Sequence, residues 1–150
     1  MRPKIIDKTM TAFNARIFLD AELPMYISMA DKDLTSLSSP QLSSEGGHQN
    51  GVNHQENKLD DYWAANAVVE AVHAAAHRIT KQNDEQDIFI KYYFDKWRDI
   101  EIARYYNVST ATITRRKTDA LVDFAIRLNH QKNNSKHNCD WLDSLVEYQS

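Results

Sequence analysis

The sequence predicts an all-α protein, a small helical bundle. Its three glycines lie at positions 46, 47 and 51, so the rest of the 150 residues form long stretches without glycine, which favour helices. Apolar residues outside that segment recur at helical spacings, whereas no strand-like alternation exceeds four residues. The apolar fraction of 42% is ordinary for a globular protein, and the length fits one domain or one domain with an arm.

Residues 1–34 are predicted to form an N-terminal helical arm. A helix should run from about Asp7 to Ala30. Its buried face is expected to hold apolar side chains at helical spacing: Ala12, Ala15, Phe18 or Leu19, Met25 and Met29. Pro24 lacks a backbone N–H and restricts the residue before it, so the helix should kink or break near Leu23.

Residues 35–57 are predicted to be a flexible linker. The segment holds all three glycines, five serines and Pro40, and it has no aromatic residue. Such a composition buries too little apolar surface to offset its chain entropy. We therefore expect the N-terminal arm to dock on the C-terminal half of the chain, on a second protomer or on a partner protein.

Residues 58–129 are predicted to be a helical domain. Its first helix, Lys58–Thr80, carries one apolar stripe: Leu59, Tyr62, Val69, Val72, Ala76 and Ile79. Asp84 should cap a second helix, Glu85–Lys96. That helix is expected to bury the side chains of Ile88, Phe89, Tyr92 and Tyr93.

Residues 99–128 predict a helix-turn-helix. A short helix over 100–106 carries the small residue Ala103, where a second helix can cross closely. Asn107 tolerates the left-handed conformation of a tight turn, Val108 supplies an apolar plug, and Ser109 can cap the next helix. The buried face of that helix, which should extend through Leu128, is predicted to hold Ile113, Ala120, Leu121, Phe124 and Leu128.

The charge distribution indicates a nucleic-acid partner only when it is counted locally. The whole chain has a formal net charge of −3, which taken alone argues against DNA. Residues 97–118, however, hold five basic and two acidic side chains, a local charge of +3. Because this one basic segment coincides with the predicted helix-turn-helix, the sequence favours binding to double-stranded DNA.

The candidate DNA-binding residues divide into two groups. Short side chains and one arginine on the exposed face of the second helix are expected to read base edges: Thr110, Ala111, Thr112, Thr114 and Arg115, next to the cap Ser109. Basic side chains around them are expected to contact phosphates: Arg98, Arg104, Arg116 and Lys117. The plainer interpretation is a helical corner without DNA, in which Arg116 or Arg104 forms a surface ion pair with Asp119 or Glu101.

Other candidate sites are weaker, and we expect no catalytic site, no metal and no cofactor. His73 and His77 lie four residues apart, but without a third ligand they are expected to face solvent. Cys139, the one cysteine, lies in a polar tail and is not expected to be a nucleophile. A single cysteine suits a reducing cytosol, and no stretch predicts a secretory signal or a membrane span. Trp97 is expected to anchor the core.

At the level of motifs, residues 99–125 resemble region 4 of bacterial sigma factors. The resemblance rests on Glu101-Ile102-Ala103, Val108-Ser109, Thr112-Ile113 and Ala120-Leu121. The whole layout resembles the ArpU/RinA-type late regulators of phages and prophages in Gram-positive bacteria, through residues 15–19, 37–43 and 92–103. Asn107 stands where that family usually has glycine, and Arg116 stands where sigma factors usually have an apolar residue.

This resemblance implies a site-specific activator of late phage or prophage genes, in the cytoplasm of the bacterial host, that contacts host RNA polymerase. We expect a homodimer, since single helix-turn-helix modules bind weakly. Residues 130–150 form a polar tail with a short apolar segment, 141–148, suited to docking or dimerisation. The alternative is a small terminase-like packaging protein. It should carry a long oligomerisation helix after the helix-turn-helix, and only this short segment follows.

Overall fold

The computed structural model describes residues 2–42, 56–134 and 136–150, with side chains left out for 56–59. Within them the chain is all-α, as predicted, and its only extended pairing is one antiparallel bridge between Ile6 and Tyr148. The elements in order are α1 Lys8–Ile17, η1 Phe18–Glu22, α2 Leu23–Met29, η2 Leu34–Ser38, α3 Glu56–Ala76, η4 Gln82–Asp84, α4 Glu85–Phe89, η5 Ile90–Phe94, α5 Asp99–Tyr106 and α6 Thr110–Lys132. None of the helices in these described ranges is long and apolar enough to cross a membrane.

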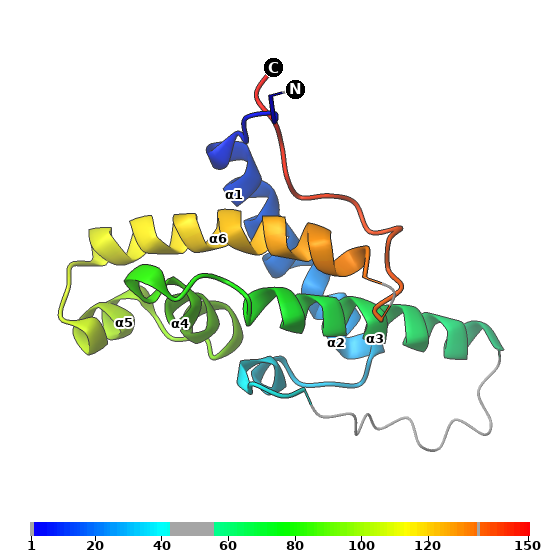
Figure 1. Cartoon of the computed structure of the whole chain (residues 1–150). Coiled ribbons are helices and arrows are strands. Elements are labelled where there is room, and N and C mark those ends of the chain that lie inside the picture. The colour runs from blue at the N-terminus through cyan, green and yellow to red at the C-terminus, as the bar shows by residue number, and fades with distance from the viewer. Residues whose placement is uncertain (1, 43–55, 135) are drawn as a thin grey trace.

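Helix α6 is the central element of the bundle. It packs against α3, α1 and α4, and α1 crosses it steeply in Figure 1. The main core joins apolar side chains from both halves of the chain, including Ala15 and Phe18 of the N-terminal arm and Phe124 of α6. Of the three docking places left open by the sequence, the arm therefore occupies the first, the C-terminal half of its own chain.

The N-terminal arm differs from prediction in its second half. Met25 and Met29 were expected in the core, but they are 52% and 40% exposed, while Leu23 and Ile27 are buried. The buried positions continue from Leu19 at spacings of four, and the methionines are out of phase with them. The predicted distortion is present as the wide π-helical turn η1, after which proline occupies the first turn of α2, where no N–H is needed.

The first part of the predicted linker is packed against the bundle, so that prediction is wrong for residues 35–42. Leu37 is fully buried in the main core. The imidazole Nε2 atoms of His77 and His73 lie 2.8 and 2.7 Å from the carbonyl oxygens of Leu37 and Ser39. The two histidines were expected to face solvent, and instead they hold this segment on α3. Residues 43–55 of the predicted linker lie outside the described residues.

This contact predicts a pH dependence of stability. Burial, with His77 4.4 Å away ring to ring, lowers the pKa of His73 below its ordinary value of 6.5. The unfolded state then binds more protons, so the free energy of unfolding should fall as the pH falls from about 7 through the lowered native pKa. Urea denaturation at several pH values measures it. His73→Gln should reduce the slope of the free energy of unfolding against pH. Burial also lowers the pKa of His137, which contributes to the slope that remains. An equal slope in both proteins contradicts this role.

The start of α4 and the C-terminal tail also differ from prediction. Asp84 does not cap α4 with its side chain and adopts a left-handed conformation with φ 57°. The predicted helix Glu85–Lys96 is α-helical only as far as Phe89, the end of α4, and continues as the π-helical turn η5. The tail has a polar composition, but part of it packs into the core, since Cys139 is fully buried. Burial raises the pKa of its thiol to about 11, so the thiol is protonated at neutral pH.

Candidate nucleic-acid interface

The connection between α5 and α6 has the local structure that the sequence predicts. Asn107 adopts the left-handed conformation, with φ 55° and ψ 49°, and ends α5. The backbone N–H of Val108 then donates to the carbonyl of Ala103 at 3.0 Å. Ser109 Oγ accepts a hydrogen bond from the Thr112 N–H at 3.1 Å and begins α6. The two helices are thus joined by a three-residue turn with a satisfied cap at each end.

A small second core fixes α6 against α4 and α5. It contains the buried residues Ile88, Ile102, Ala103 and Ile113. Trp97 and Tyr106 pack on it as partly buried side chains. Trp97 therefore contributes to packing, as expected, and the ammonium of Lys91 lies 4.9 Å above its ring. Ile102, Ala103 and Ile113 belong to the predicted helix-turn-helix, whereas Ile88 comes from α4, outside residues 99–128.

The predicted base-reading residues lie together on the first two turns of α6. Ser109, Thr110, Ala111, Thr114 and Arg115 are exposed, and Thr112 is half-buried. The Thr114 hydroxyl donates to the Thr110 carbonyl at 3.1 Å, and that of Thr118 donates to the Thr114 carbonyl at 3.0 Å. Their hydroxyl protons are therefore engaged. What Thr114 presents outward is a methyl group and an acceptor lone pair.

The predicted phosphate-contacting residues differ in how free they are. Arg98 and Arg104 are exposed, and Arg98 Nε lies 3.2 Å from Glu101 Oε1. The Arg98 backbone N–H donates to the same carboxylate and, as the main cause, lowers the pKa of Glu101. Such an exposed pair is weak and can yield to a phosphate.

Of the three consecutive basic residues 115–117, two form ion pairs within the protein and one does not. Arg116 lies 4.0 Å from Asp84, not against Asp119 as the plainer interpretation held. The Lys117 ammonium lies 2.7 Å from the Asp99 carboxylate and 3.6 Å from the Tyr92 ring centroid, and only 12% of its side chain is exposed. Arg115 alone of the three has no ion-pair partner among the described residues.

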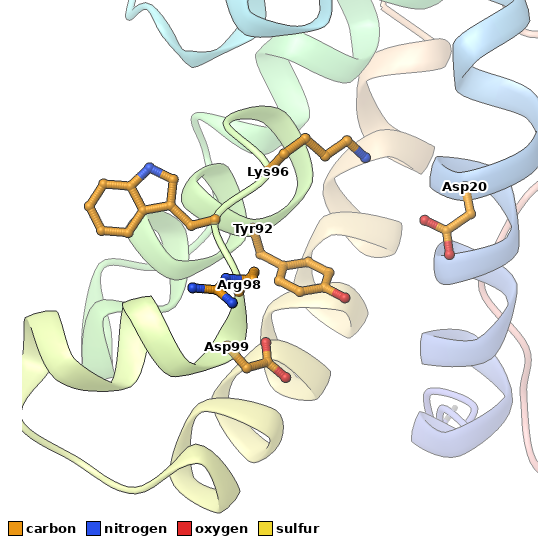
Figure 2. A pocket seen from close by; sticks show the side chains of 6 residues that line it. Asp20, Tyr92, Lys96, Arg98 and Asp99 are labelled. Atoms are coloured by element: carbon orange, nitrogen blue, oxygen red, sulfur yellow. The ribbon is translucent and has the colours of Figure 1, made fainter.

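A groove runs beside this surface, and its far wall comes from the N-terminal arm. Figure 2 shows Asp20 facing Tyr92, Lys96, Arg98 and Asp99 across a pocket. A second pocket shares three of these residues and extends along α6. It also contains the side chains of Arg16, Thr114 and Thr118. Sequence reasoning missed Arg16 and Asp20, because no local signal indicates which side chains of a distant helix line α6, and it also missed Lys96, which lies just before α5.

The Lys117–Asp99 ion pair should position α6 and not contact DNA. Lys117→Met keeps the length of the side chain but strands a partly buried carboxylate, so it is expected to lower the free energy of unfolding by about 1–3 kcal/mol. Arg116→Met, which loses only a longer and more exposed contact, should cost less than about 1 kcal/mol. Chemical denaturation of both variants measures the difference. If the free energy of unfolding falls equally little in the two variants, the ion pair has no positioning role.

Neither a metal-binding cluster among the described residues nor a similar protein indicates the function of this surface. Among the residues that the structure describes, no group of three histidine, cysteine, aspartate or glutamate side chains could hold a metal ion. A comparison with protein-family models, with curated proteins and with solved structures found no match to this chain.

Proposed function

We propose that this chain is a sequence-specific regulator of transcription that binds double-stranded DNA through the first two turns of α6. The observation that carries the proposal is the composition of that surface: short exposed side chains surround Arg115, which has no ion-pair partner among the described residues, in a segment with a local charge of +3. Short side chains allow a helix to approach base edges in the major groove, and an arginine can bind guanine bidentately.

In this proposal, contacts to bases and contacts to phosphates are made by different residues. Arg115, Ala111 and Thr114 share the exposed face and would contact bases. Arg98 and Arg104 are exposed and would contact phosphates. The structure gives Lys117 and Arg116 intramolecular partners, so we assign them to holding α6 in place and not to phosphate contacts.

The biological setting is proposed from the resemblance. It consists of activation of late phage or prophage genes, a homodimer on paired half-sites, contact with host RNA polymerase, and the cytoplasm of a bacterial host. The described C-terminal residues favour this setting over a ring-forming packaging protein. After α6 the chain forms no further helix among residues 136–150, and it returns to pair Tyr148 with Ile6 at the N-terminus.

Thr114 tests whether a methyl group is read. Thr114→Val keeps the methyl and removes only a hydroxyl that already bonds within α6, so affinity for the preferred site should change by less than about 1 kcal/mol. Thr114→Ser removes the methyl and should cost about 1 kcal/mol at a site where it meets a thymine. Fluorescence anisotropy with the preferred duplex measures both. A larger loss for valine than for serine contradicts methyl contact.

The experiment that tests the proposed function is selection of bound sequences from random duplex DNA with the full chain. An enriched motif of one or two half-sites is the expected result. Failure to enrich any motif removes the sequence-specific function. A reporter driven by a promoter that carries the motif then tests activation.

A further inference from the structure

A second candidate site lies away from α5 and the start of α6, between the middle of α3 and residues 136–141, whose backbone can be followed in Figure 1. The pocket encloses about 370 Å³, within the usual range for small-ligand sites. The side chains that matter for its chemistry are Trp63, Asn66, Glu70, Lys136, His137 and Trp141. The proposed DNA-binding surface uses none of them.

Two residues that line this pocket each have a buried polar atom without a hydrogen-bond partner among the described residues. The side-chain amide of Asn66 donates to Glu70 Oε1 at 3.0 Å, which leaves the buried Asn66 Oδ1 without a partner in the described parts of the chain. His137 Nε2 lies 3.1 Å from Gln131 Oε1. The buried Nδ1 of the same ring has no hydrogen-bond partner among the described residues.

Both residues lie beside the same carboxylate, that of Glu70. His137 Nδ1 lies 3.8 Å from Glu70 Oε2, and 42% of the Glu70 side chain is exposed. Burial, as the main cause, lowers the pKa of His137, so the ring is neutral at neutral pH and does not pair with Glu70 as a cation. The exposed Glu70 carboxylate, with the unpartnered amide oxygen of Asn66 beside it, favours a ligand that is positively charged and rich in hydrogen-bond donors.

The walls of the pocket add two indole rings. Trp63 and Trp141 are 57% and 52% exposed, which is unusual for the largest apolar side chains. Both are held from behind by aromatic contacts, with ring centroids 4.9 Å from Tyr62 and 6.4 Å from Tyr26 respectively. Indole faces attract cations and stack with planar ones, of which guanidinium is the common example in proteins.

We propose that this pocket binds a guanidinium group, stacked on the indole rings of Trp63 and Trp141 and donating hydrogen bonds to Glu70. Guanidinium suits the site better than ammonium, because it is planar, presents several donors to a carboxylate and is more weakly hydrated. Two other cations face His137, Lys136 on the rim and Arg78. Lys136 should therefore oppose the ligand. The proposal does not depend on DNA binding.

The test uses the full chain and N-acetyl-arginine-N-methylamide as the probe, followed by NMR of the indole Nε1–H groups. The protein has three tryptophans, and the third, Trp97, packs in the second core. Titration should shift the signals of Trp63 and Trp141 in a saturable way, with a Kd on the order of 1 mM for so small a ligand, and leave Trp97 unchanged. The lysine analogue should bind at least about threefold more weakly.

Three variants make the test specific. Glu70→Gln keeps the shape of the side chain and should weaken binding about tenfold or more, because the charge-assisted hydrogen bonds are lost. Lys136→Gln should tighten binding about two- to threefold. Asp119→Asn, at an exposed position of α6 outside the pocket, is the control and should leave the binding of the probe unchanged. Circular dichroism shows that each variant is folded, and the wild-type tryptophan shifts remain decisive if one is not.

Two further arms distinguish the source of the group. Tighter binding of free arginine indicates a small metabolite, and tighter binding of a blocked Gly-Arg-Gly peptide indicates an arginine of a partner protein. Either result supports the guanidinium site. Shifts that do not saturate by 20 mM, equal shifts of all three indoles, equal binding of the lysine analogue, or weaker binding by Lys136→Gln would overturn it.

Discussion

Arg115→Ala is expected to weaken binding to the preferred duplex by about 1–3 kcal/mol, roughly 5- to 150-fold in Kd, and to relax one base preference. Arg115 lies at the centre of the exposed face of α6 and has no ion-pair partner among the described residues, so its guanidinium is free to bind a guanine edge. Anisotropy measurements with the preferred duplex, and with duplexes changed at each position in turn, give both quantities.

Arg127→Ala is the matched control on the same helix. Arg127 lies three turns further along α6, with its Nε 3.2 Å from Asp123. Its replacement by alanine should leave DNA affinity unchanged. If Arg115→Ala weakens binding equally on every duplex, Arg115 contacts the backbone and does not read a base. If both arginine variants lose the same amount of DNA affinity, the effect is one of net charge alone.

Leu37→Ala is expected to lower the free energy of unfolding by about 2–5 kcal/mol, because Leu37 is fully buried and its loss leaves a cavity in the main core. The effect is large for a segment whose composition predicts a linker. Chemical denaturation followed by circular dichroism measures it.

Thr35→Ala, two residues earlier on the exposed side of the same short 3₁₀ helix, is the control and should change stability by less than about 0.5 kcal/mol. A Leu37 variant as stable as the control would mean that this segment does not pack on α3 in solution. The histidine contacts to the carbonyls of Leu37 and Ser39 would then also be absent.

The parts of the fold that depend on local sequence could be predicted. The turn at Asn107, the cap at Ser109 and the apolar face of α6 follow from residues within a few positions of each other, and the structure has all of them. Helix α6 extends four residues beyond the predicted Leu128. Propensity and spacing act over such distances, and that is why they were sufficient here.

The parts that depend on contacts between distant segments could not be predicted. Leu37 stands among serines, so its burial in the main core, where η2 packs on η5, has no periodic signal. The ion pairs of Lys117 with Asp99 and of Arg116 with Asp84 join residues 18 and 32 positions apart, and they change which cations of the basic segment are free for DNA. The groove wall with Arg16 and Asp20 depends on how α1 crosses α6.

The measurement that tests the central claim most directly is amide chemical-shift mapping of the full chain with the duplex obtained by selection. DNA binding through the start of α6 predicts the largest shifts at residues 109–118, smaller ones near Arg98 and Arg104, and small ones at Arg127 and beyond. Shifts confined to other parts of the chain, or no saturable shift with any duplex at low salt, would contradict it.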